Sequence, residues 1–95
     1  MFIILLRFSE NRSKAGQFIE GHKQWIKRGL DDGVFLLVGS LQPNFGGAVL
    51  AHNTSLSDIR SRVAEDPFVA ENVVNAEILE IAPAQAEKRL QFLMA

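Results

Sequence analysis

Apolar and polar residues follow two different patterns along this chain. Residues 2–8 form a continuous β-branched and aromatic run with a polar stretch after it, which is typical of a strand buried on both faces. From about Ser13 to Leu30, apolar residues recur at steps of three and four, which predicts an amphipathic helix of about five turns. The chain is therefore expected to begin with a strand and a long helix.

The next apolar run predicts a hairpin. A strand is expected from Val34 to Ser40, after the turn sequence Asp31–Gly33. Residues 42–47 have the Pro, Asn and Gly content of a hairpin connection, and a third strand is expected at residues 48–52. The second and third strands should therefore be antiparallel.

A second helix and a last strand complete the pattern. The helix is expected to begin at Ser55, because Ser55 and Asp58 have the spacing of a capping box in which Asp replaces the usual Glu or Gln. It should end before Asp66 and Pro67, since the residue before a proline avoids helical dihedral angles. After a turn, a strand is expected at residues 76–81. The order βαββαβ predicts an α+β, ferredoxin-like fold: a four-stranded antiparallel sheet, first and third strands central, helices on one face.

The first two expected strands are apolar on both faces, whereas the two helices can cover only one face of the sheet. Ile3 and Leu5 alternate with other large apolar residues, so both faces of the first strand are apolar. Helices on one face of the sheet leave the other face uncovered. A second copy packed sheet to sheet would bury it, so we expect a homodimer of the dimeric α/β barrel type.

Composition and charge narrow the class of protein. Of 95 residues, 47% are hydrophobic, and the formal net charge is -1. Nucleic-acid binding needs a clustered cationic excess, so we expect no nucleic-acid partner. The short apolar run 2–6 fits neither a signal peptide nor a membrane span, so we expect no membrane partner and a cytoplasmic location. We divide the chain into a domain, residues 1–83, and a C-terminal extension rich in helix formers, residues 84–95.

The sequence offers few groups for a cofactor. It contains no Cys and two histidines, His22 and His52, whose spacing is not that of a metal site. His52 is expected to lie exposed at a strand end. Gly46 and Gly47 are too few for a phosphate-binding loop, and no Lys follows them. We therefore expect neither a metal nor an organic cofactor.

Four polar residues are expected to converge at one cleft. In this topology Arg7, Ser40 and Asp66 lie at the same rim of the sheet, and His22 lies on the sheet-facing side of the first helix. A carboxylate bonded to an imidazole would fix one tautomer, as a general base acting near neutral pH requires. Such a pair would suit removal of an acidic C–H or O–H proton, with Arg7 and Ser40 available to bind a substrate.

Each of these residues also has a purely structural interpretation. His22 can be a core histidine bonded to a backbone carbonyl, and Asp66 can cap a helix whose first residue is proline. Arg7 can pair with Glu80 on the neighbouring strand, and Ser40 can serve only the turn. The two roles of Asp66 can coexist, because a cap uses one oxygen.

Five segments of the chain form a combined pattern over residues 1–83. They are Gly21–Ile26, Asp32–Leu36, Gly39–Ser40, Gly46–Ala51 and Glu65–Val69. Together they resemble the YciI-like (YCII-related) family of small bacterial proteins, although that family usually has proline where this chain has Ser40. The resemblance implies a dimeric α/β barrel of the ferredoxin-like type, with His22 and Asp66 as an active-site pair. One related enzyme type is a dehydrochlorinase, and the fold is shared with muconolactone isomerase-like enzymes.

Three hypotheses about function follow. The first is a lyase or isomerase acting on a small organic molecule, with His22 as general base and acid and Asp66 orienting it. The second is a binding or regulatory module that holds a metabolite in the same cleft, with Arg7 and Ser40 contacting a carboxylate. The third is a structural accessory subunit without a pocket.

Overall fold

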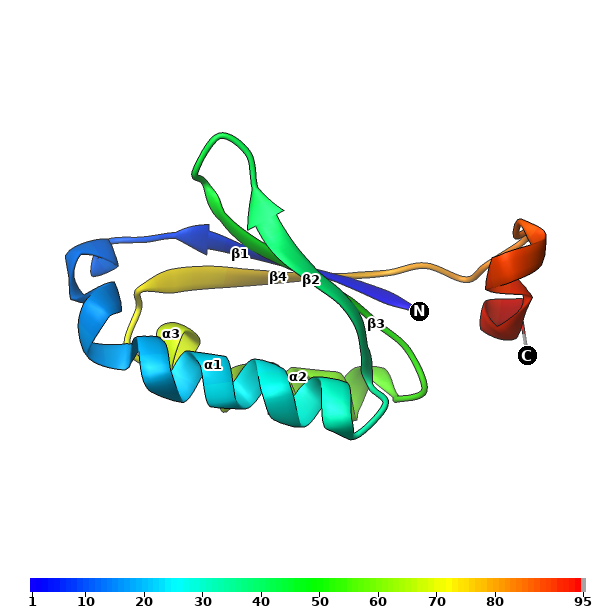
Figure 1. Cartoon of the computed structure of the whole chain (residues 1–95), viewed down its shortest axis with the longest axis horizontal. Helices are drawn as coiled ribbons and strands as arrows, with labels where there is room; N and C mark the ends of the chain where they lie inside the picture. The colour runs from blue at the N-terminus through cyan, green and yellow to red at the C-terminus, as the bar shows by residue number, and fades with distance from the viewer. Residues whose placement is uncertain (95) are drawn as a thin grey trace.

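The computed structural model describes residues 1–94 and has one sheet with helices on a single face (Figure 1). The strands are β1 (Phe2–Phe8), β2 (Phe35–Leu41), β3 (Gly46–Ala51) and β4 (Val74–Glu80). The helices are α1 (Ala15–Asp31), α2 (Leu56–Ala64) and α3 (Pro67–Ala70), with 3-10 segments η1 (Arg12–Lys14) and η2 (Lys88–Met94).

The strands are antiparallel in the order β2-β3-β1-β4, which places the first and third strands at the centre. In Figure 1, α1 and α2 run below the sheet, and the β2–β3 hairpin rises on the other side. The α+β, ferredoxin-like fold expected from the order of elements is confirmed. Across residues 1–94, none of the helices combines the length and apolar character that a bilayer crossing demands.

The core lies between the sheet and the helices. Alternate residues of β1, namely Phe2, Ile4 and Leu6, are buried on this side. They belong to one cluster with Trp25 of α1 and Ile59 of α2. Because side chains alternate along a strand, the intervening residues of β1 point the other way.

The opposite side of the sheet, which we call the open face, is apolar and uncovered. The register of the strands places large apolar side chains from all four strands on it: Ile3, Leu5, Leu37, Leu50 and Leu79. Leu37 is 60% exposed and Leu79 is 41% exposed. The uncovered apolar face expected from the sequence is thus present.

Two helical regions differ from the sequence expectation. The long helix begins at Ala15 instead of Ser13, after the 3-10 turn of η1, and no side chain caps its start. A tighter 3-10 turn is a common start for a helix that lacks a cap. The short helix α3 lies where a turn is expected after Asp66, and it confirms the structural interpretation of Asp66 as the cap of a helix that begins with proline. A helix of four residues is too short to be recognised from an apolar periodicity in the sequence.

The strands differ from expectation by one or two residues at their ends. Pairing extends β2 to Leu41 and begins β3 at Gly46, because these two residues are partners in the register. It also begins β4 at Val74, which pairs with Phe8. The ends of these strands are therefore set by backbone pairing with the neighbouring strand and not by the pattern of apolar side chains.

The C-terminal segment lies beyond the end of β4, apart from the helices (Figure 1). It forms the 3-10 segment η2, not the α-helix favoured by its composition, and none of the residues of η2 is buried. The ring of Phe92 meets His52 edge to face at 5.6 Å. The division into a domain of residues 1–83 and an extension stays a prediction.

Candidate active site

Asp66 is fixed at the corner between α2 and α3. Pro67 occupies the first position of α3, and Asp66 is its N-cap, with Oδ1 accepting a hydrogen bond from the backbone N–H of Phe68 at 3.0 Å. The side chain of Asp66 is completely buried. The corner therefore holds a carboxylate inside the protein in one orientation.

The helix α1 brings His22 to this corner. Its Nδ1 lies 2.9 Å from Oδ1 of Asp66, and its side chain is 14% exposed. The approach is close because Gly21 faces Pro67: a Cβ at position 21 would lie 3.0 Å from Cγ of the proline. The structure therefore brings His22 and Asp66 together, and one oxygen of Asp66 acts both as helix cap and as imidazole partner.

This contact decides which imidazole nitrogen is free. An ionised carboxylate can only accept, so Nδ1–H of His22 donates to Asp66 and a neutral ring keeps its lone pair on Nε2. The other oxygen of Asp66, Oδ2, is buried and has no hydrogen-bond partner within residues 1–94. The buried carboxylate is therefore compensated through Oδ1, by His22 and the backbone of Phe68.

Two aromatic residues hold the imidazole plane. The ring of Phe68 stacks on His22 with centroids 4.0 Å apart and planes inclined by 4°. Trp25 stacks at 5.9 Å and donates its Nε1–H to the carbonyl of Arg62 at 2.8 Å. The sequence predicts both rings as core residues, some of which could also line an apolar pocket around the polar cluster. Their spacing in the sequence could have indicated their place beside the pair. Trp25 is one helical turn from His22, and Phe68 comes two residues after Asp66.

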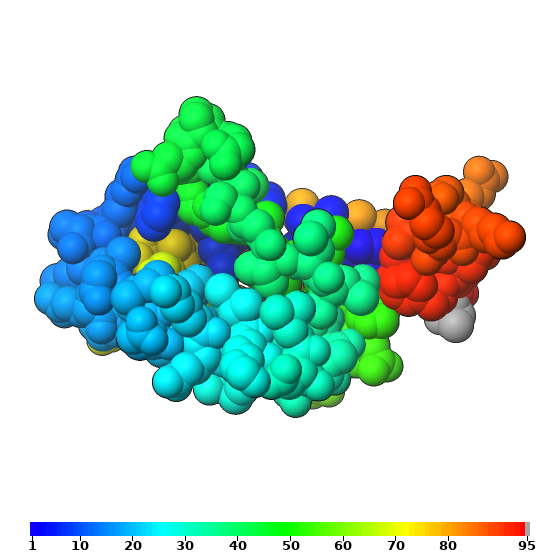
Figure 2. All heavy atoms as spheres, viewed as in Figure 1, coloured from blue at the N-terminus to red at the C-terminus, as the bar shows by residue number. Residues whose placement is uncertain are grey.

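His22 lines a cavity of about 260 Å³ between α1 and the sheet. Ser40 and Gly47, which pair across β2 and β3, line its sheet side. Figure 2 shows the surface hollowed between α1 and the hairpin, with yellow atoms of the α3 and β4 region visible at depth. The volume is near the lower end for ligand sites, so the cavity suits a small molecule. Of the predicted site residues, His22, Asp66 and Ser40 therefore meet at or beside it.

Arg7 lies on the other face of the sheet. Because Leu6 points toward the helices, Arg7 points to the open face, where its Nη1 pairs with Oε1 of Glu77 at 2.7 Å and both side chains are half-exposed. The expected pairing with Glu80 is wrong, because the register places Glu80 opposite Phe2. Among the described residues, the lining of the cavity includes no Lys or Arg.

His52 does not join the site. It follows β3 and is half-buried rather than fully exposed, since the ring of Phe92 packs on it. Within residues 1–94, no three His, Asp or Glu side chains are grouped so that they could hold a metal ion.

Comparison with protein families and with curated proteins finds no match for this sequence. Among solved structures, the chain is similar to 5-chloro-2-hydroxyhydroquinone dehydrochlorinase (TftG) from Burkholderia phenoliruptrix, in complex with 2,5-dihydroxybenzoquinone. The TM-score is 0.68 at 12% sequence identity, over 85% of this chain and 93% of that protein. At this identity the likeness is one of fold, and it places the chain with the ferredoxin-like α/β structures.

Proposed function

We propose that this protein is a cytoplasmic lyase or isomerase of the YciI-like family, which moves a proton on a small organic molecule. The observation that carries the proposal is the 2.9 Å contact between His22 and the buried Asp66 at the wall of a cavity. A carboxylate, an imidazole and an adjoining space for a ligand are the parts that general acid–base catalysis needs.

Nε2 of His22 is the proposed base. Because Nδ1 is held by Asp66, Nε2 is the ring nitrogen left to act on a ligand in the cavity that His22 lines. Nε2 takes a proton from an acidic C–H or O–H bond, and Asp66 stabilises the imidazolium that forms. The electron pair left on the substrate then either expels a leaving group from the adjacent carbon or shifts a double bond. In the second case the imidazolium returns the proton at the new position.

The cavity walls fit this chemistry. Phe68 and Trp25 keep the imidazole in one plane, so that Nε2 has a fixed direction. Across the cavity, the hydroxyl of Ser40 is the proposed hydrogen-bonding group for a substrate oxygen. The structural neighbour supports the reaction class, because a dehydrochlorinase eliminates hydrogen chloride from its substrate.

We also propose that two copies pack through their open faces. Every strand contributes a leucine to this face, and β1 adds Ile3, so a twofold pairing of sheets would bury all of them at once. The charges of Arg7 and Glu77 on this face compensate each other within one chain. Sheet-to-sheet packing therefore buries apolar surface without burying an unpaired charge.

The test of the catalytic proposal is proton exchange from carbon in D₂O, followed by NMR. Weak C–H and O–H acids, including halogenated hydroxyquinols and cyclic 1,3-diketones, are incubated with the wild type and with His22→Gln, Asp66→Asn and His52→Gln. For any compound that exchanges or turns over, His22→Gln is expected to slow the reaction by about 10²- to 10⁴-fold. His52→Gln is the matched control and should leave the rate unchanged.

Two results would contradict the proposal. Full activity of His22→Gln would remove the imidazole from the mechanism. Tight binding of compounds in the cavity without exchange of any of them would instead favour the non-catalytic binding module. Urea unfolding of each variant separates loss of chemistry from loss of fold.

A further inference from the structure

A second hollow, of about 560 Å³, lies beside the cavity at the turn of the β2–β3 hairpin. It is lined by two arginines, Arg7 and Arg12, by the rings of Phe8 and Phe45, and by hairpin residues between them. No carboxylate side chain from residues 1–94 lines it. The hollow therefore has a cationic lining and borders the cavity that His22 lines.

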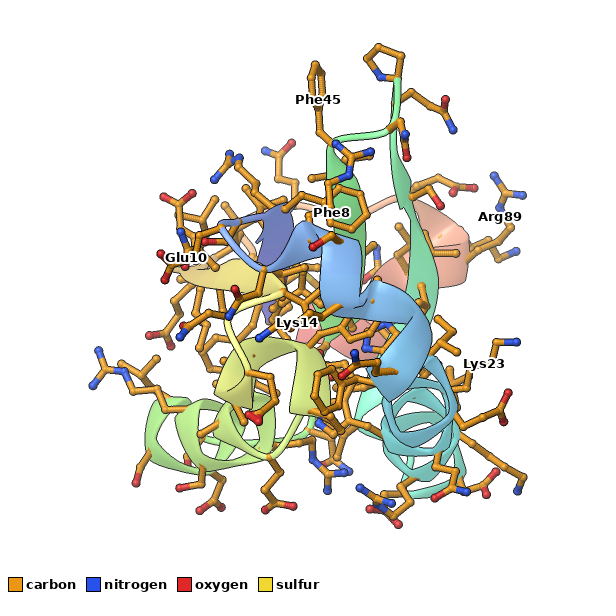
Figure 3. The ribbon with its side chains drawn as sticks, turned by 90° about the vertical axis from the view of Figure 1, so that its left-hand side faces the viewer. Phe8, Glu10, Lys14, Lys23, Phe45 and Arg89 are labelled. Atoms are coloured by element: carbon orange, nitrogen blue, oxygen red, sulfur yellow. The ribbon has the colours of Figure 1, made fainter. Side chains whose placement is uncertain are left out.

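The two hollows share a wall. Phe8 lines both of them, and the hairpin contributes adjacent residues to each, with Gly46 in the cavity and Phe45 in the second hollow. The backbone N–H of Phe8 donates to the carbonyl of Phe45 at 2.9 Å, which ties the hairpin to the end of β1. Figure 3 shows Phe45 on the hairpin above Phe8. The two hollows are therefore neighbours at the end of the sheet, and a ligand that occupies both would have to pass the ring of Phe8.

The charge of the second hollow comes from Arg12. Its guanidinium lies 4.2 Å above the ring of Phe8, which holds it in place by a cation–π contact. Within the described chain no carboxylate pairs with Arg12, whereas Arg7 is already paired with Glu77. A guanidinium stacked on a ring keeps the N–H groups at its edge free, in the fork geometry that suits carboxylates and other oxyanions.

We infer that the second hollow binds the anionic group of the substrate, a carboxylate or a related oxyanion, while the reacting part of the same molecule lies beside His22. This inference rests on the proposed function. It divides the substrate by polarity: the cavity takes the uncharged part, since no Lys or Arg among residues 1–94 lines it, and Arg12 binds the charged group. The substrate class is therefore a small organic acid. The anion-binding role expected for Arg7 passes to Arg12.

The test compares two planar probes that differ mainly in charge, 4-hydroxybenzoate and 4-hydroxybenzamide. Both are titrated by NMR into the wild type, Arg12→Gln and Arg60→Gln. Arg60 is an exposed residue of α2, so its variant has the same change in charge without touching either hollow. We expect the wild type and Arg60→Gln to bind the benzoate at least about threefold more tightly than the amide. In Arg12→Gln the ratio should fall to about one.

The resonances that move identify which claim fails. Support requires that the benzoate shifts both the His22 ring and the amides of Phe8 and Phe45. Equal binding of both probes beside His22, unaffected by Arg12→Gln, would overturn the inference and leave the proposed function standing. If the benzoate shifts Phe8 and Phe45 in an Arg12-dependent way but does not shift His22, one ligand does not occupy both hollows, and the inference is overturned. That result would also count against the cavity as a ligand site.

Discussion

The ring of Phe68 lies parallel to the imidazole of His22 at 4.0 Å, and the backbone N–H of Phe68 donates to the carboxylate oxygen that binds the same imidazole. One residue thus holds both members of the proposed catalytic pair. The side chain limits tilt of the ring, and the main chain fixes Asp66. We regard Phe68 as a positioning residue.

Replacing this ring should cost stability. Phe68 is buried, so Phe68→Leu is expected to lower the free energy of unfolding by about 1 to 2 kcal/mol through lost packing and lost stacking. Urea unfolding measures the change. Phe45→Leu is the control: this phenylalanine is 60% exposed, and its variant should stay within about 0.5 kcal/mol of the wild type. Equal stability of both variants would show that the stacking is incidental.

The tautomer of His22 should depend on Asp66. At a pH where the ring is neutral, ¹⁵N NMR of the wild type should show the proton on Nδ1, because Asp66 accepts from it. Asp66→Asn keeps an oxygen that can cap α3 but removes the charge, so the fraction with the proton on Nε2 should rise. The tautomer of His52 serves as an internal control. A wild-type ring protonated on Nε2 would refute the assigned direction of the hydrogen bond.

Two glycines of α1 should respond in opposite directions to the same substitution. A Cβ at Gly29 would overlap the ring of Phe35, whereas a Cβ at Gly16 meets nothing within 4 Å. Gly29→Ala is therefore expected to destabilise the protein by about 1 to 3 kcal/mol, although alanine favours a helix. Gly16→Ala should be neutral or stabilising by up to about 1 kcal/mol. Thermal unfolding of the pair measures both changes, and a stabilised Gly29→Ala would mean that Phe35 moves freely.

Self-association should depend on the open face. Leu50 lies on a central strand of this face, so Leu50→Arg is expected to convert a dimer into a monomer. Leu30→Arg places the same charge on an exposed position of α1, where a cation suits the helix C-terminus, and should leave the dimer intact. Sedimentation velocity gives the masses. A wild type that sediments as a 10.6 kDa monomer would contradict the proposed assembly.

Much of the arrangement could be predicted from the sequence, because it depends on local signals. Helical spacing places His22 one turn from Trp25 and therefore on the sheet side of α1. Pro67 ends one helix and begins another, which makes Asp66 a cap. The order of elements predicts that the two residues meet, because the ferredoxin-like topology brings the corner at Asp66 next to the long helix that carries His22.

The side of the sheet on which Arg7 lies could not be predicted, for a physical reason. Residues 2–6 are all apolar, so they show no alternation that indicates which of them point toward the helices. The register between strands also depends on the whole sheet. For this reason the sequence suggested Glu80 as the partner of Arg7, whereas the structure pairs Arg7 with Glu77. The stacking of Arg12 on Phe8 joins the 3-10 segment η1 to the end of β1, and the periodicity of the sequence does not indicate such a contact.

One oxygen of Asp66 both caps α3 and binds His22, and this limits which substitutions the cleft can accept. Directed evolution toward a new substrate cannot exchange that carboxylate without also loosening the turn that carries it. The opposite wall is less constrained, because no side-chain hydrogen bond within residues 1–94 involves Ser40. Variation in specificity should therefore accumulate on β2, while the corner remains the same.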